Sequence, residues 1–324
     1  MEKSERKNTR SRRRFLAQTA GLAATGALFP LAPKASASHL PDGLAPQDGV
    51  TRTAIRRLRI PRTGELLSVI GLGTARTFDA DPKQAPETLT AVMRSFLEWG
   101  GSLVDSSPMY GRAEAMVGAL CRKVGRDDLF YATKVWTDKG KQAGVEQMTE
   151  SERLMGTTRF DLMQVHNLVG LDVQLDTLKD WRASGRLRYV GITEMRDMKK
   201  VEELVAGGVI DFIQIPYSVT DRRVEDRVLP ACIEHGVAAL VMQPFRSGRL
   251  FGAVKGMEVP AWAADYGASS WAQLFLKFVL GHDAVTLPIP ATSKPHHLDD
   301  NMAAGLGSDL DAPARAKLIA LMEG

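Results

Sequence analysis

The sequence predicts an α/β fold, namely a (β/α)8 TIM barrel preceded by an N-terminal β-hairpin and followed by a short C-terminal helix. Eight short apolar or β-branched segments alternate with longer segments whose apolar residues recur every three to four positions. Such alternation indicates parallel strands joined by right-handed crossovers, and eight repeats close a barrel of roughly 250 residues. An open doubly wound sheet would usually carry a G-x-G-x-x-G turn after its first strand. Residues 71–76 read GLGTAR and lack the third glycine, so the barrel is favoured.

The predicted elements follow one another along the chain. Residues 55–60 and 66–69 form the hairpin, which we expect to plug the bottom of the barrel. A last amphipathic segment, residues 311–322, predicts the C-terminal helix. The eight barrel strands are expected at residues 68–71, 103–105, 129–134, 162–166, 189–192, 212–215, 238–242 and 284–287.

The basic charge of the chain is concentrated at its N-terminus. Residues 1–37 contain eight Lys or Arg and two acidic residues, which leaves 34 basic and 36 acidic residues in the remainder. The body therefore carries a net charge of −2, although the whole chain carries +4. Because nucleic-acid binding needs a basic face on the folded domain, the composition argues against that class of partner.

The first 37 residues have the pattern of an export signal. Arg12 and Arg13 lie in the sequence SRRRFL, which resembles a twin-arginine signal. The uncharged stretch 15–29 is too short to span a bilayer, and residues 35–37 (ASA) predict cleavage after Ala37. We therefore expect a signal peptide at 1–37, a linker at 38–52 and the barrel at 53–324, in a periplasmic or otherwise exported protein that uses the twin-arginine export machinery and has no stable membrane span.

The chain contains two cysteines, Cys121 and Cys232, both in predicted helices. A disulfide and two buried thiols are both compatible with their positions.

Four polar residues follow or end predicted strands: Asp105, Tyr110, Lys134 and His166. The chemistry of a parallel barrel gathers at this end of its strands. A Tyr hydroxyl is a poor acid at pH 7, but a nearby ammonium group lowers its pKa. A carboxylate holds the ammonium in place, and a histidine can donate a hydrogen bond to a substrate oxygen. Together these groups predict a proton donor aimed at a carbonyl oxygen that becomes an alkoxide.

In the order and spacing of these four residues, the chain resembles the aldo/keto reductase superfamily over about residues 53–322. The resemblance implies NAD(P)H-dependent reduction of a small-molecule aldehyde or ketone to an alcohol. Tyr110 would be the general acid, Lys134 and Asp105 would tune it, and His166 would orient the carbonyl. NADP is the implied cofactor, with NAD possible, because Ala291, Thr292 and His297 occupy positions where many members grip the 2′-phosphate with Lys, Ser and Arg.

The same resemblance implies a strip of cofactor contacts along the later strands. Thr193, Glu194 and Gln214 would bind the nicotinamide carboxamide, with Glu194 replacing the usual Asn and able only to accept a hydrogen bond. Tyr217 would stack on the nicotinamide ring. The remaining implied contacts are Gly73, Thr74, Pro244, Phe245, Gly248, Arg249, Thr292, Lys294, His297, Asp300 and Asn301, and Phe78, Trp136 and Trp262 are apolar candidates for the substrate wall.

Two other functional classes are alternatives to the reductase. A nucleotide-loaded redox-sensing or regulatory binding module, with little multiple-turnover activity, is the alternative to the enzyme. A metal-dependent barrel hydrolase would need His and Asp clusters at several strand ends, but only His166 of six histidines lies at one, so no metal site is predicted. The sequence leaves the particular carbonyl substrate and the oligomeric state open.

Overall fold

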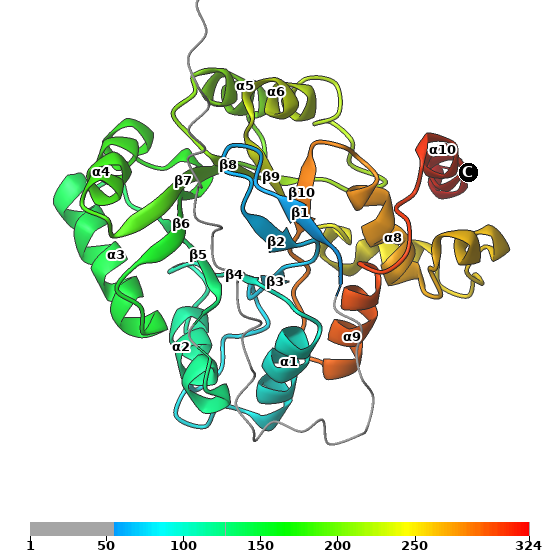
Figure 1. Ribbon diagram of the computed structural model, residues 1–324, viewed down its shortest axis with the longest axis horizontal. Coiled ribbons are helices and arrows are strands. Elements are labelled where there is room, and N and C mark those ends of the chain that lie inside the picture. The colour runs from blue at the N-terminus through cyan, green and yellow to red at the C-terminus, as the bar shows by residue number, and fades with distance from the viewer. Residues whose placement is uncertain (1–54, 127, 324) are drawn as a thin grey trace, which may run out of the picture. The chain divides into compact units, whose positions relative to one another are not determined.

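The computed structural model describes residues 55–126 and 128–323 (Figure 1). Its centre is one sheet of eight parallel strands, each paired with its neighbours in chain order. The first and last strands also meet, because the amide of Gly71 donates to Pro288 O at 3.0 Å and that of Gly73 to Pro290 O at 3.1 Å. The predicted barrel is therefore confirmed. Its strands are β3 (Leu72–Gly73), β4 (Leu103–Asp105), β5 (Phe130–Val135), β6 (Phe160–Val165), β7 (Leu187–Thr193), β8 (Phe212–Pro216), β9 (Ala238–Met242) and β10 (Val285–Pro288).

Helices surround the strands (Figure 1). Several end at a glycine in the left-handed conformation, such as Gly125 (φ 68°) and Gly156 (φ 73°), where a residue without a side chain is favoured. The helices are α1 (Glu87–Glu98), α2 (Ala113–Val124), α3 (Lys141–Met155), α4 (Leu171–Ala183), α5 (Met198–Ala206), α6 (Val228–His235), α7 (Arg249–Ala253), α8 (Trp271–Leu280), α9 (Pro295–Ala303) and α10 (Ala312–Glu323), with 3₁₀ turns at His166–Leu168, Arg246–Gly248 and Ala261–Tyr266.

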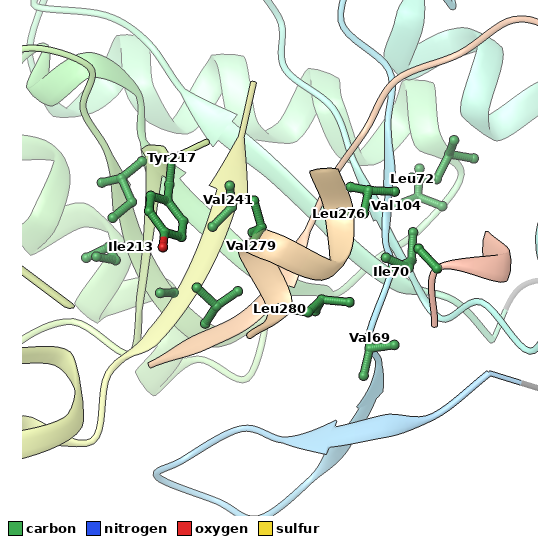
Figure 2. Packing of buried hydrophobic residues seen from close by; sticks show 14 of the residues in the cluster. Val69, Ile70, Leu72, Val104, Ile213, Tyr217, Val241, Leu276, Val279 and Leu280 are labelled. Atoms are coloured by element: carbon green, nitrogen blue, oxygen red, sulfur yellow. The ribbon is translucent and has the colours of Figure 1, made fainter. Parts of the chain in front are cut away.

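The hairpin of β1 (Arg57–Arg59) and β2 (Leu66–Ser68) closes one end of the barrel. Ile60 and Leu67 are fully buried in a cluster with inward side chains of the strands, such as Phe130. A larger apolar layer fills the space between the strands and the helices, and Figure 2 shows part of it. The open, chemically active end must therefore be the opposite one, where the strands terminate.

The first barrel strand begins later than we expected. Residues 68–71 were expected to form it, but Ser68 pairs with Arg57 in the hairpin, and the barrel strand is Leu72–Gly73. Ser68 therefore belongs to β2, and residues 69–71 only lead into the barrel.

Other expectations concern the cysteines and the leader. Cys121 and Cys232 are not joined in a disulfide and both are buried, and burial raises the pKa of the Cys232 thiol to about 12. The signal peptide at 1–37 and the linker at 38–52 lie outside the described residues. Over the ranges 55–126 and 128–323, none of the helices has the length and apolar character needed to cross a membrane.

Candidate active site

The alternation of side chains along the strands builds a polar layer above the apolar barrel floor. Because successive strand residues point to opposite faces, the inward Phe130 and Ala132 of β5 place Lys134 inward as well. By the same two-residue period, Asp105 points inward like Leu103 in β4, and Gln214 points inward like Phe212 in β8. The interior of the barrel is therefore lined by apolar side chains at the hairpin end and by polar side chains where the strands end.

A buried ion pair lies at the centre of this layer. Lys134 Nζ is 2.6 Å from Asp105 Oδ2 and donates to Ser106 O at 2.7 Å, and the side chains are 0% and 2% exposed. Gln164 and Gln214 donate their amide N–H groups to Asp105 Oδ1 at 3.1 and 2.8 Å. Burial lowers the pKa of Lys134, but Asp105 and Tyr110 raise it more, so its net pKa lies above the ordinary value. The lysine therefore carries its charge at neutral pH.

Tyr110 lies in the loop after β4, with its ring centroid 5.0 Å from Lys134 Nζ. Lys134 lowers the pKa of Tyr110, as the sequence led us to expect. Burial raises that pKa by more, however, so the net pKa of the phenol is above its usual value. The expectation of an unusually acidic phenol is therefore wrong, because desolvation outweighs the nearby cation.

His166 faces Tyr110 across the site. The two ring centroids are 6.0 Å apart and the ring planes are perpendicular. Burial, with a smaller contribution from Lys134, lowers the pKa of His166 to about 3. The imidazole is therefore neutral near pH 7. All four predicted catalytic residues meet at the open end of the barrel.

Two basic side chains at this end are available for an anionic ligand. Arg249 begins α7 after β9, and Lys294 precedes α9 after β10. Both are exposed, and neither has a recorded side-chain partner in the described part of the chain. Gly248, next to Arg249, has φ 88° and no atom within 4 Å of where a Cβ would lie. These residues fit the phosphates of a dinucleotide. The glycine allows a phosphate to approach the backbone closely, and the two cationic side chains can pair with the negative charge of the phosphates.

Three predicted cofactor contacts are engaged elsewhere. Tyr217 is fully buried in the outer apolar layer (Figure 2). Its ring packs on that of Phe278, with the ring centroids 5.9 Å apart. Its hydroxyl contacts Glu225 and Arg315. Because the side chain is 0% exposed, the ring offers no free face to a nicotinamide. The alternation of side chains along a strand predicts that Tyr217 points outward, because it lies three residues after the inward Gln214.

Glu194 and Asp300 accept hydrogen bonds from other groups of the protein. Glu194 Oε1 accepts from the backbone amides of Met195 and Arg196, each at 2.7 Å. Asp300 accepts from Ser270 at 2.8 Å and from Gln273 at 2.7 Å, which fastens α9 to α8. Both oxygens of Asp300 are therefore engaged within the protein, whereas the contacts of Glu194 engage its Oε1.

Several other predicted residues make structural contacts at the strand ends. Thr74 Oγ1 donates to Asp105 O at 3.0 Å, and Thr193 Oγ1 accepts from the amide of Asn167 at 3.0 Å. A Cβ on Gly73 would lie 2.5 Å from Ile289 O, so barrel closure by itself requires this glycine.

The remaining predicted residues border the same loops. Phe245 packs on Phe251 with ring centroids 5.0 Å apart, and exposed His297 lies 4.4 Å from the ring of His296. Pro244, Thr292 and Asn301 are buried beside them.

The sequence reasoning missed three residues of the site. Gln164 reaches Asp105, and the buried Ser107 hydroxyl lies 3.1 Å from His166 Nδ1. Gln243, directly after β9, has φ 54°, which is strained for a residue with a side chain and is typical of functional loops. The alternation of side chains along β6 could have predicted that Gln164 points inward. The contact of Ser107 could not be predicted in this way, because it depends on the packing of two loops.

No cluster of three or more His, Cys, Asp or Glu side chains able to hold a metal ion is found within residues 55–126 and 128–323.

Comparison with known proteins identifies relatives of the chain. A profile of the aldo/keto reductase family matches residues 69–313. The chain is 25% identical over 243 residues to the NADH-specific methylglyoxal reductase of Escherichia coli K12, covering 64% of this chain and 73% of that protein. It is 29% identical over 213 residues to the aldo-keto reductase YhdN of Bacillus subtilis, covering 60% of this chain and 63% of that protein.

Solved structures with the same fold include an aldo/keto reductase from Klebsiella pneumoniae in complex with NADP and acetate. The TM-score is 0.70 at 25% sequence identity, and the match covers 80% of this chain and 93% of the other. Since the family profile spans most of the barrel and the four strand-end residues meet in space, the chain belongs to the aldo/keto reductase family.

Proposed function

We propose that this protein is an NAD(P)H-dependent oxidoreductase that reduces an aldehyde or ketone to an alcohol, with Tyr110 as the general acid. The observation that carries the proposal is the buried Lys134–Asp105 pair, 2.6 Å apart, beside the Tyr110 ring and a neutral His166. The family assignment and the NADP complex of a relative support the same chemistry.

The proposed cofactor is NADPH, with NADH as the alternative because one relative is NADH-specific. Arg249 and Lys294 would hold the phosphates, and Gly248 would allow close approach of the backbone. Gln214, buried on β8 beside Asp105, would meet the nicotinamide end. When bound, the reduced nicotinamide supplies the hydride that adds to the carbonyl carbon.

The residues of this chain handle the proton and the developing charge. Tyr110 donates its hydroxyl proton to the carbonyl oxygen, and the charge of Lys134 stabilises the phenolate that remains. Asp105, held by two glutamine amides, keeps the ammonium group in place. Neutral His166 donates a hydrogen bond that orients the carbonyl oxygen.

We further propose an apolar substrate wall at the same mouth. Met109, which precedes Tyr110, is 42% exposed, and Trp136, two residues after Lys134, is 41% exposed. Exposed large apolar side chains beside an acid favour a carbonyl substrate with an apolar substituent. Phe78, expected as part of the wall, is completely buried and cannot line it. Trp262 is half-buried and packs edge-on against Tyr266.

Export also belongs to the proposal. The SRRRFL sequence, the uncharged stretch after it and the cleavage pattern ending at Ala37 support transport by the twin-arginine machinery to the periplasm or another exported location.

The test of the activity is the variant Tyr110→Phe. It is expected to bind NADPH as the wild type does, measured by tryptophan fluorescence, and to lose carbonyl reduction by a factor of about 10²–10⁴, the usual contribution of a general acid. Tyr189→Phe is the matched control, because the Tyr189 hydroxyl contacts Thr63 and Glu65 at the hairpin end of the barrel. Undiminished turnover in Tyr110→Phe would refute the assignment. Only a single turnover by the wild type would instead favour the redox-sensing or regulatory module.

A further inference from the structure

We propose that Ser107 is a positioning residue that holds His166 in the tautomer with its proton on Nε2, so that the imidazole donates to the substrate oxygen. This inference rests on the proposed function. It concerns a buried hydroxyl that the sequence did not single out.

The hydrogen bonds of Ser107 determine whether its hydroxyl or His166 Nδ1 is the donor. Its Oγ accepts the backbone amide of Met109 at 3.2 Å and lies 3.1 Å from His166 Nδ1. Ser107 is fully buried, so its hydroxyl proton needs an acceptor within the protein. Within residues 55–126 and 128–323, His166 Nδ1 is the acceptor recorded for it. The serine therefore donates and Nδ1 accepts.

The protonation of the ring follows from this contact. A neutral imidazole carries one N–H, and its tautomer is set by the hydrogen bond that the other nitrogen makes. Because burial and Lys134 hold the pKa of His166 at about 3, the ring is neutral at the pH of catalysis. With Nδ1 accepting, the proton must lie on Nε2. The opposite tautomer would present a lone pair to the carbonyl oxygen and repel it.

The same serine also connects the histidine to the acid. The backbone amide of Tyr110 donates to Ser107 O at 3.0 Å, which forms the turn that carries the phenol. One residue therefore positions Tyr110 through its backbone and His166 through its side chain. Replacing the side chain leaves the backbone contact in place, so the two effects can be separated.

The deciding measurement is nitrogen-15 NMR of the histidine ring nitrogens in the full chain, with the His166 signals assigned by their loss in His166→Asn. In the wild type we expect a protonated Nε2 and an unprotonated Nδ1. In Ser107→Ala we expect a mixture of tautomers, and in Ser107→Thr, which keeps the hydroxyl, the wild-type pattern.

Kinetics supply a second measurement. Ser107→Ala should lower kcat roughly tenfold, equivalent to about 1.4 kcal/mol and comparable to one net hydrogen bond, with the KM for NADPH unchanged. Ser107→Thr should restore kcat. Ser151→Ala is the matched control, because Ser151 is equally buried but lies on α3 outside the barrel.

Two outcomes would overturn the inference. One is a wild-type His166 protonated on Nδ1, and the other is an unchanged tautomer in a folded Ser107→Ala variant. The wild-type spectrum decides even if the variants fail to fold. It is also independent of turnover, so a failed reductase assay in the Tyr110→Phe test would not be mistaken for a failed tautomer assignment.

Discussion

Removing the charge of Lys134 tests whether the buried ion pair organises the site. In Lys134→Met the long apolar side chain is kept, but Asp105 loses its only ion-pair partner recorded within the described residues. Breaking a buried pair on one side costs about 3–5 kcal/mol, because the other charge remains buried. Two glutamine amides still donate to Asp105, so the lower end of that range applies.

We therefore expect Lys134→Met to lose about 3 kcal/mol of stability. For a domain of this size, that corresponds to a decrease in Tm of roughly 6–12 °C. Thermal unfolding followed by circular dichroism measures it. Carbonyl reduction should decrease by a factor of about 10²–10⁴, because the phenolate of Tyr110 is no longer stabilised.

The double variant Lys134→Met/Asp105→Asn separates the ion pair from general damage to the core. It removes the unpaired carboxylate but keeps an oxygen that accepts from Gln164 and Gln214. Its stability should exceed that of Lys134→Met, although its activity should stay low. If the effects of the two single variants simply add, within about 0.5 kcal/mol, the pair is not coupled and the reasoning is refuted.

Three further predictions concern pH, cofactor choice and export. The pKa of folded His166, about 3, is lower than the ordinary value of 6.5, so the unfolded chain binds more protons between these values. Stability should therefore fall as the pH is lowered from 6.5 towards 3, by at most about 5 kcal/mol at 1.36 kcal/mol per pKa unit, and His166→Asn should flatten this decline in denaturant titrations. Parallel pH profiles of the two proteins would contradict the assignment. Lys294→Ala should raise the KM for NADPH about 10–100-fold, the usual effect of losing a charged hydrogen bond, and should change the KM for NADH little. Equal changes in the two KM values would show that Lys294 does not bind the 2′-phosphate. Replacing Arg12 and Arg13 with Lys should retain the protein in the cytosol in cell fractionation, and unchanged export would exclude the twin-arginine route.

Much of the fold and the four catalytic candidates were predictable because they depend on patterns local to the chain. The apolar period of the strands and the polar residues at their ends predicted the barrel and placed Asp105, Lys134 and His166 at one mouth. The same period correctly predicts an outward Tyr217 once Gln214 is known to face inward. The assignment of Tyr217 to the nicotinamide followed a resemblance and ignored that period.

The tertiary structure decided the contacts that join distant parts of the chain. Gln164 and Gln214 meet one oxygen of Asp105 across 59 and 109 residues of sequence, and Ser107 reaches His166 across 59. These contacts depend on the register between strands and on loop packing, which no local pattern encodes. Burial decided the direction in which the pKa of Tyr110 shifts. The sequence showed a cation beside Tyr110, but not how much water the fold removes from the phenol. A charge beside a group can be read from residue types, whereas its desolvation exists only after the barrel has closed.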